Sequence, residues 1–112
     1  MTTSDQVEEL KKLFPNVNYA EEGGYRYFLI QNLALPEHCA PKIIDVLLCP
    51  DPKDGYHSRL YFAEQVNSGK SLNWHVQGIR ILERNWFAFS WQLPTGLRMA
   101  QMLTSHLRGL TC

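Results

Sequence analysis

Hydrophobic and polar positions change their spacing along the chain, and the first stretch has the period of a helix. Val7, Leu10 and Phe14 recur at helical spacing, and a proline follows them. Thr3 and Gln6 stand three residues apart, which is the spacing of a capping box at a helix N-terminus. The pattern predicts an N-terminal helix with one apolar face.

The middle of the chain changes to runs of strand length. The stretches VNYAEE and YRYFLIQNLAL flank Gly23-Gly24, a pair that favours a tight hairpin turn because glycine accepts positive φ. KIIDVLLC is almost continuously apolar, which is typical of a central strand covered on both faces. After the turn PDPKDGYH, RLYFAEQV has the composition of a further strand. These runs predict about four antiparallel strands.

The last part of the chain ends on a second helical pattern. HVQGIRILERNWFAFSWQL mixes short β-like stretches with Asn and Gly, and its period does not distinguish strands from irregular structure. Thr95 is expected to cap the helix that follows. Its apolar stripe consists of Leu97, Ala100, Leu103, Leu107 and Leu110. Without a βαβ alternation, the order of elements predicts an α+β fold in one domain over residues 1–112, with helices at both ends.

Composition narrows the classes of function. The 112 residues are 45% hydrophobic, which is enough for one packed core. Eleven basic residues balance eleven acidic ones, so a nucleic-acid partner is not expected. The charged start has no apolar stretch of the signal-peptide kind, and no run of about 18 apolar residues occurs. The expectation is a cytoplasmic protein that does not bind membranes.

Three cysteines bear on redox and metal chemistry. Cys39, Cys49 and Cys112 are odd in number and include no Cys-x-x-Cys pair, so neither a disulfide framework nor a metal site is indicated, and no cofactor is expected. Cys49 ends an apolar strand and is expected to be an inert core residue. Cys39 lies in a loop expected to be exposed, beside His38, and a nucleophile and base pair there is an alternative.

The order of elements and the stretch GGYRYFLIQNLALPEHCAPKIIDVLLCPDPKDGY together resemble prokaryotic family E of the ubiquitin-conjugating-enzyme (UBC) superfamily. In that family, a Gly-Gly hairpin leads to a strand ending in Leu-Pro. An apolar strand with one Asp and a Pro-rich turn ending near Gly-Tyr follow. The matching residues here are Gly23, Gly24, Leu35, Pro36, Asp45, Leu47, Leu48, Pro50, Gly55 and Tyr56. The resemblance implies a UBC-like fold.

The second half of the family pattern is matched in part. His75 corresponds to a His in the loop after the last sheet strand, and Arg84-Asn85-Trp86 to an Arg-x-Trp segment. Phe89-Ser90-Trp91-Gln92 corresponds to a degraded Trp-Ser-Arg-His motif, in which Trp91 and Gln92 replace the Arg and the His.

A UBC enzyme needs a cysteine for its thioester, after the fourth sheet strand and downstream of a His-Pro-Asn turn. The corresponding window, roughly Asn67 to Gln92, contains neither. The resemblance therefore implies a non-catalytic or degenerate domain that acts as a binding or scaffold protein in a bacterial ubiquitin-like modification pathway. Its implied partners are a ubiquitin-like protein, an activating-type adenylating enzyme or a JAMM-type isopeptidase.

Two other functions stay open. One is an unorthodox acyl-transfer enzyme that uses His75, whose imidazole titrates near neutral pH, as the catalytic group on a ubiquitin-like C-terminus. The other is a plain protein-interaction domain unrelated to ubiquitin-like pathways. Trp74, Trp86 and Trp91 are the candidate binding residues, because tryptophan is over-represented in binding hot spots. Core packing is the alternative for Trp86, and a working surface is expected where His75 meets residues 86–91.

Overall fold

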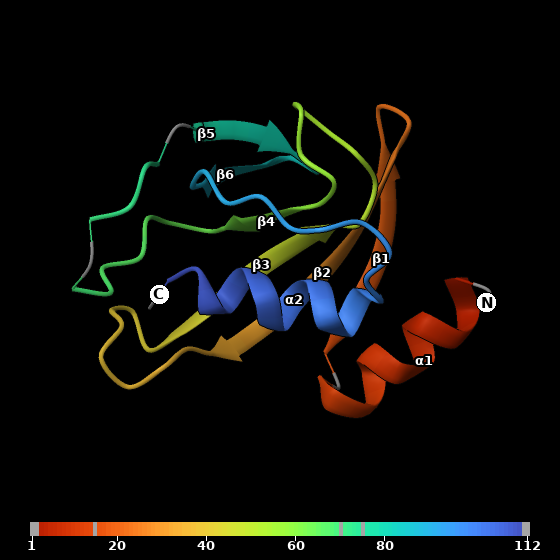
Figure 1. The fold of residues 1–112 in the computed structure, drawn as a ribbon, viewed down its shortest axis with the longest axis horizontal. Helices are drawn as coiled ribbons and strands as arrows, with labels where there is room; N and C mark the ends of the chain where they lie inside the picture. Colours follow the sequence, from red (N-terminus) through yellow and green to blue (C-terminus); the bar gives the residue numbers. More distant parts are fainter. Residues whose placement is uncertain (1–2, 15, 70, 75, 111–112) are drawn as a thin grey trace.

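The computed structural model describes residues 3–14, 16–69, 71–74 and 76–110. Within these residues, no helix is long and apolar enough to cross a membrane. The elements in chain order are α1 (Thr3–Leu13), β1 (Val17–Glu22), β2 (Tyr25–Ala34), β3 (Ile43–Cys49), β4 (Arg59–Phe62), β5 (Val76–Ile81), β6 (Arg84–Ala88) and α2 (Met99–Arg108). Figure 1 shows one sheet with α2 lying across it and α1 beside β1 and β2.

The sheet has six strands in the order β1-β2-β3-β4-β6-β5, and all neighbours are antiparallel. The prediction of an α+β fold with an antiparallel sheet and a helix at each end is confirmed. The count of about four strands was wrong. The four expected strands are β1 to β4, and the segment whose period was ambiguous forms a fifth and a sixth. Leu82 and Glu83 make the turn of this β5–β6 hairpin with φ of 52° and 65°.

The predicted Gly-Gly hairpin is present as β1 and β2. Gly23 and Gly24 have φ of 61° and 84°, backbone angles that residues with a Cβ rarely adopt. Val17 pairs with Ile30 and Glu22 with Tyr25, so β1 matches only the first six residues of β2. The remainder of β2 runs on past the end of β1.

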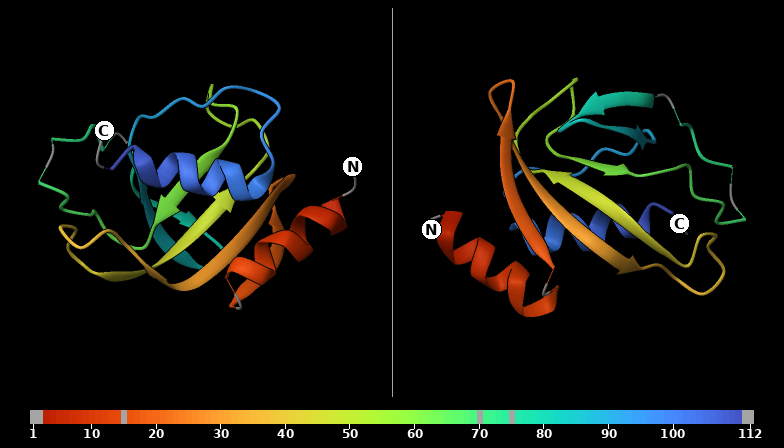
Figure 2. Two further views of the ribbon diagram at one scale, coloured as in Figure 1. Left: turned by 60° about the horizontal axis from the view of Figure 1, so that its bottom comes forward. Right: turned by 180° about the vertical axis from the view of Figure 1, so that it is seen from behind.

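Helix α2 covers one face of the sheet and closes the larger core (Figure 2). Leu103 on α2 is fully buried in the same cluster as Phe28 of β2 and Val46 and Leu48 of β3. Apolar side chains from alternate strand positions therefore meet the apolar stripe of the helix. The C-terminal helix therefore shares its core with the strand formed by KIIDVLLC.

The start of α2 differs from the prediction. The helix begins at Met99 rather than next to Thr95. The Met99 backbone N–H donates to Gln6 Oε1 of α1 at 2.9 Å, and the Arg98 N–H donates to Gln101 Oε1 at 2.9 Å. Side-chain oxygens from another helix and from the first turn thus satisfy backbone donors that a local Ser or Thr usually satisfies.

The opposite face of the sheet holds a second, smaller core. Its buried members are Tyr27, Leu47, Cys49, Tyr61, Ile81, Trp86 and Ala88. Contacts between non-neighbouring strands help to enclose it. Arg84 Nη1 of β6 lies 3.2 Å from Asp45 Oδ2 of β3, and the Leu82 N–H donates to Glu22 Oε2 of β1 at 3.2 Å.

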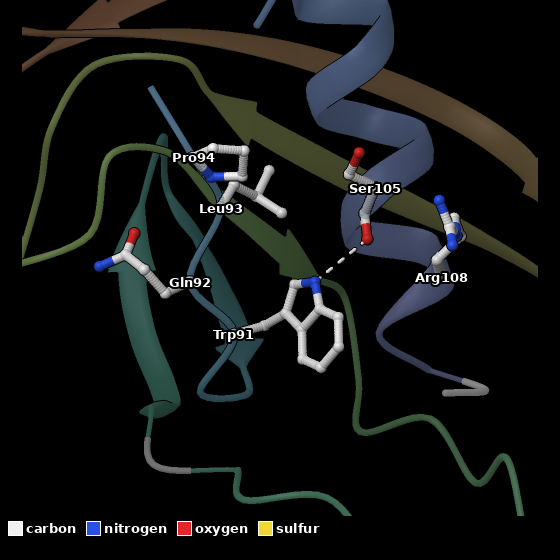
Figure 3. Close-up of a pocket in the computed structure, with 6 residues that line it drawn as sticks. All are labelled: Trp91, Gln92, Leu93, Pro94, Ser105 and Arg108. Carbon is white, nitrogen blue, oxygen red and sulfur yellow. Dashed lines mark hydrogen bonds between the residues drawn. The ribbon is translucent and has the colours of Figure 1, made fainter. Parts of the chain in front are cut away.

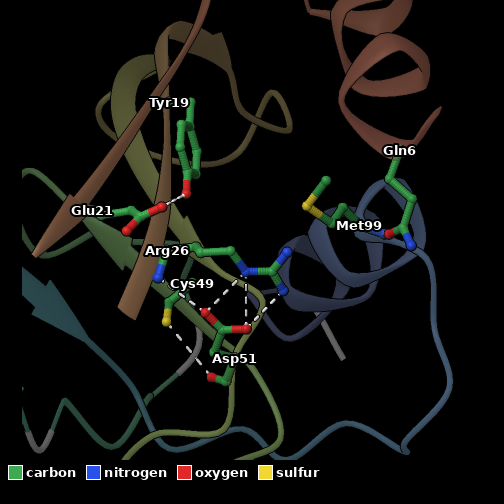
Figure 4. A network of polar contacts seen from close by, with 7 residues as sticks. All are labelled: Gln6, Tyr19, Glu21, Arg26, Cys49, Asp51 and Met99. Atoms are coloured by element: carbon green, nitrogen blue, oxygen red, sulfur yellow. Dashed lines mark hydrogen bonds and ion pairs between the residues drawn. The ribbon is translucent and has the colours of Figure 1, made fainter. Parts of the chain in front are cut away.

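The turn after β3 is fixed to β2 by one ion pair (Figure 4). Asp51 accepts hydrogen bonds from the Arg26 backbone N–H at 2.9 Å, from Arg26 Nε and from Arg26 Nη2 at 2.7 Å. These hydrogen bonds hold the pKa of Asp51 below its ordinary value. In the same region Tyr19 donates its phenol hydrogen to Glu21. Charged hydrogen bonds therefore help to hold this end of the sheet.

Candidate functional site

Residues 90–94 connect β6 to α2, and Trp91 fixes this segment to the helix. The Trp91 indole Nε1–H donates to the Ser105 carbonyl at 3.1 Å. The indole ring lies against Gly109, where an added Cβ would come within 2.8 Å of Trp91 Cδ2 and 3.0 Å of Phe89. The missing side chain of Gly109 therefore allows the ring to pack closely on the end of the helix.

Gln92 fixes the other side of the segment to the turn after β3. Its Nε2 donates to the Gly55 carbonyl at 3.0 Å, and its Oε1 accepts the His57 N–H at 3.1 Å. Tyr56 and Ser90 share a hydroxyl hydrogen bond of 2.7 Å. The Gln92 amide thus makes both a donor and an acceptor contact to this turn, so Gln92, like Trp91, anchors the segment.

A hollow of about 480 Å³ opens between this segment and the last turns of α2. We call it the Trp91 hollow. It is lined by Trp91, Gln92, Leu93, Pro94, Ser105 and Arg108. Figure 3 shows the indole and Pro94 on one side, Ser105 and Arg108 on the helix, and Gln92 turned away from the helix. The described lining has one cation and no carboxylate, and most of the remaining wall is apolar.

The other two tryptophans pack in the cores. Trp74 makes edge contacts with Phe62 and Phe89, at ring distances of 5.7 and 5.2 Å. Trp86 is 1% exposed, and its Nε1–H donates to the Ile81 carbonyl at 2.9 Å. Trp74 and Trp91 adjoin the cluster under α2, whereas Trp86 belongs to the cluster on the opposite face. Of the three, only Trp91 lines the hollow, and a buried Trp86 offers no surface to a partner.

His75, the candidate catalytic residue, lies outside the described residues, and so does Cys112. The other two thiols are buried. Cys39 is 2% exposed, which corrects the expectation of an exposed loop thiol, and burial raises its pKa. Burial raises the pKa of Cys49 to about 11, which confirms its expected role as a core residue.

His106 is a buried residue whose environment the sequence did not reveal. It is 3% exposed, and its Nε2 lies 2.9 Å from Ser58 Oγ. Burial, and then the nearby charge of Arg59, lower its pKa to about 3, so the ring is neutral at physiological pH. A sequence signal existed, because His106 stands three residues after Leu103 on the apolar stripe. The Ser58–His106 pair has the distance of a nucleophile and base, but its burial makes it a structural hydrogen bond.

Two cations that pack on tyrosine rings were also not predicted from the sequence. Lys53 Nζ donates to the Tyr61 hydroxyl at 3.0 Å and lies 5.4 Å from the Tyr25 ring centre. The Arg59 guanidinium stacks 4.2 Å from the Tyr56 ring centre. Lys53 and its turn line a second hollow of about 360 Å³. In the described ranges, no group of three or more His, Cys, Asp or Glu residues is placed to hold a metal ion.

Comparisons of the chain with protein-family models, with curated proteins and with solved structures gave no significant match.

Proposed function

We propose that this chain is a non-catalytic, degenerate UBC-like domain that acts as a binding or scaffold protein in a ubiquitin-like modification pathway. It binds its partner through the Trp91 hollow. One observation carries the proposal. Trp91 and Gln92, which replace the Arg and His of the family motif, anchor the backbone and form one wall of the hollow.

The buried thiols support binding rather than acyl transfer. A thioester-forming cysteine must be accessible and must reach the thiolate form. Cys39 and Cys49, the two thiols among the described residues, are both buried, and the pKa of each is raised. Neither meets the requirement of a nucleophile at neutral pH.

The chemistry of the hollow suggests what a partner presents. The Trp91 indole and Pro94 offer apolar surface, and Arg108 adds a positive charge to the same lining. Tryptophan and arginine are the residue types most enriched in binding hot spots. A segment of a ubiquitin-like protein with an apolar side chain next to an acidic group would complement both features.

A binding experiment tests the proposal directly. Titrating a candidate ubiquitin-like protein into the 15N-labelled chain should shift the indole N–H resonance of Trp91, and the resonances of Trp74 and Trp86 should move less. Arg108→Gln should weaken binding about tenfold or more, the effect of losing a hot-spot residue, and the Tm of each variant is measured so that lost binding is separated from lost folding. Arg80→Gln is the matched control, because Arg80 is an exposed arginine on β5 that does not line the hollow. Equal affinities of the two variants would refute the assignment of the surface.

The absence of catalysis needs its own experiment. The chain is incubated with the ubiquitin-like protein, its activating enzyme and ATP, and the products are separated with and without a thiol reductant. We expect no adduct of the chain. An ATP-dependent adduct that the reductant removes would show thioester chemistry and would contradict the non-catalytic function, whatever the binding data show.

A further inference from the structure

Strand β2 extends beyond the end of β1 near α1. The pairing of β1 with β2 stops at Val17 and Ile30, and the Gln31 N–H then donates to the Asn16 carbonyl at 3.1 Å. In the described part of the chain, Leu33 and Ala34 pair with β3 alone. The outer side of β2 is thus an open sheet edge over these last residues, next to the end of α1.

A hollow of about 300 Å³ occupies this place. It lies between Leu13 and Phe14 at the end of α1, Asn16, and residues 30–34 of β2. Its accessible apolar surface comes from Leu13 and the partly buried Phe14, because Ile30 and Leu33 also line it but are only 1% and 4% exposed. The exposed residues Asn16 and Gln31 add amide groups to the lining. Leu13 is 58% exposed although it is a large apolar residue. We call this the α1–β2 hollow.

The backbone around the α1–β2 hollow is fixed before any ligand arrives. Asn32 has φ of 55°, and its N–H donates to Asp45 Oδ1 on β3 at 2.9 Å. This contact fixes the irregularity between Ile30 and Leu33 in the β2–β3 pairing. A rigid edge of this kind costs little entropy when a further strand is added.

The charges near the α1–β2 hollow are mainly positive. Lys11 and Lys12 are exposed in the last turn of α1, and Lys42 is exposed where its carbonyl accepts the Leu35 N–H just beyond β2. No acidic residue occurs in the described lining. Of the nearby carboxylates, Glu9 is held by Arg98, and Asp45 accepts the Asn32 N–H and pairs with Arg84. Glu8 is exposed four residues before Lys12, and Glu37 is exposed in the loop that leads to Lys42. Three lysines in a chain with no net charge therefore mark this end of the sheet.

We propose that the α1–β2 hollow binds an extended acidic segment of a partner protein. The segment packs one apolar side chain against Leu13 and Phe14, aligns its backbone with the open edge of β2, and places carboxylates opposite the lysines. The apolar contact selects the inserted side chain, and the lysines select negative charge. The strand edge and the amides of Asn16 and Gln31 supply hydrogen bonds to the backbone of the segment. This surface is separate from the Trp91 hollow and does not depend on the function proposed there.

Two peptides test the inference against the full chain. Ac-Glu-Asp-Leu-Asp-Glu-NH2 is titrated into the 15N-labelled protein, and Ac-Gln-Asn-Leu-Asn-Gln-NH2 serves as the uncharged counterpart. The acidic peptide should shift Gln31, Leu33, Ala34 and the Asn16 side-chain amide. Its affinity should fall with added salt, because the lysines are exposed. The uncharged peptide should bind at least about tenfold more weakly, a difference of about 1.4 kcal/mol.

Two serine variants give a matched comparison. Leu13→Ser removes an apolar side chain that is 58% exposed and lines the hollow, whereas Ile43→Ser removes one that is 60% exposed and does not. Both should keep Tm, and only Leu13→Ser should lower the affinity for the acidic peptide. Equal binding of the two peptides, equal effects of the two variants, or shifts confined to other residues would each overturn the inference. Shifts of the same residues with protein concentration alone would also overturn it, because the occupant would then be a second copy of the chain.

Discussion

The two faces of the sheet are built in different ways. The face under α2 is filled by aliphatic and phenylalanine side chains from β2, β3, β4 and the helix. The opposite face is filled by Tyr27, Tyr61 and Trp86 together with Leu47, Ile81, Cys49 and Ala88. An aliphatic core gains stability by burial alone, whereas tyrosine and tryptophan must also find partners for their polar atoms. The first face is therefore expected to dominate stability, and the second to depend more on specific polar contacts.

Each face nevertheless includes a polar contact among its apolar side chains. Under α2 it is the neutral His106 with Ser58. On the opposite face it is Lys53, which lies between the rings of Tyr25 and Tyr61 and donates to the Tyr61 hydroxyl. The first is a hydrogen bond between uncharged groups, and the second keeps a positive charge next to aromatic rings. Variants on each face can separate these contributions.

The largest effect is expected under α2. Leu103 is fully buried, so Leu103→Ala should reduce the free energy of unfolding by about 2–5 kcal/mol, the range for truncating a buried leucine. Denaturant titration measures it. Leu107→Ala is the control on the same helix, because Leu107 is only half buried and should cost less. A loss below about 1 kcal/mol at Leu103 would mean that the helix does not pack as described.

The next effect is a dependence of stability on pH from the same face. His106 has a folded-state pKa of about 3 against an ordinary value of 6.5, so between these values the unfolded chain binds a proton that the folded chain excludes. Stability from this group is therefore present above pH 6.5 and is lost as the pH falls toward 3. The slope should reach about 1.4 kcal/mol per pH unit.

His106→Gln separates this slope from that of the carboxylates. Glutamine can retain a hydrogen bond to Ser58 and does not titrate. Urea titrations of both proteins between pH 7 and pH 4 should show a smaller loss of stability with acid in the variant. If the free energy of unfolding of the two proteins fell in parallel with pH, protonation of His106 would cost the folded state nothing. That result would contradict a buried, neutral His106 paired with Ser58.

The residue pattern predicted the fold where one property of the sequence was sufficient. Gly23-Gly24 marked the β1–β2 hairpin, and KIIDVLLC marked the central strand. The β5–β6 hairpin was left undecided between strands and irregular structure, because Leu82 and Glu83, rather than Gly or Asn, take the positive φ angles of its turn. A local signal for the turn was therefore absent.

The candidate site depended on contacts between distant parts of the chain. Trp91 was identified as a candidate from its type alone, but its position required Ser105 and Gly109 of the last helix. The start of α2 depends on Gln6, which is 93 residues away from Met99. The burial of Cys39, and the Lys53–Tyr61 contact, likewise follow from the packing of loops on the sheet. The type of a residue can therefore mark it as a candidate, but whether it is exposed depends on contacts between distant parts of the chain.

A smaller effect is expected from the polar contact on the opposite face. Tyr61→Phe removes the hydroxyl that accepts from Lys53 at 3.0 Å and leaves the ring in place. It should reduce the free energy of unfolding by about 0.5–1.5 kcal/mol, the usual net value of one hydrogen bond. Lys53→Met and the double variant complete a cycle in denaturant titrations. A coupling energy of zero between the two changes would show that the contact does not stabilise the protein.

The smallest effect should appear as a difference in reactivity between the two faces, since each holds one buried thiol. Cys39 belongs to the cluster under α2 and lies in the loop between β2 and β3, whereas Cys49 ends a central strand on the opposite face. Burial raises the pKa of both, to about 11 for Cys49, and tenfold less thiolate forms for each added pKa unit. Loops open at a lower free energy than central strands. In single-thiol variants that also carry Cys112→Ser, a disulfide reagent at neutral pH should therefore modify Cys39 roughly tenfold or more faster than Cys49, and both far more slowly than the unfolded chain. Faster modification of Cys49 would mean that the aromatic face opens first, and the ranking of the two faces would be reversed.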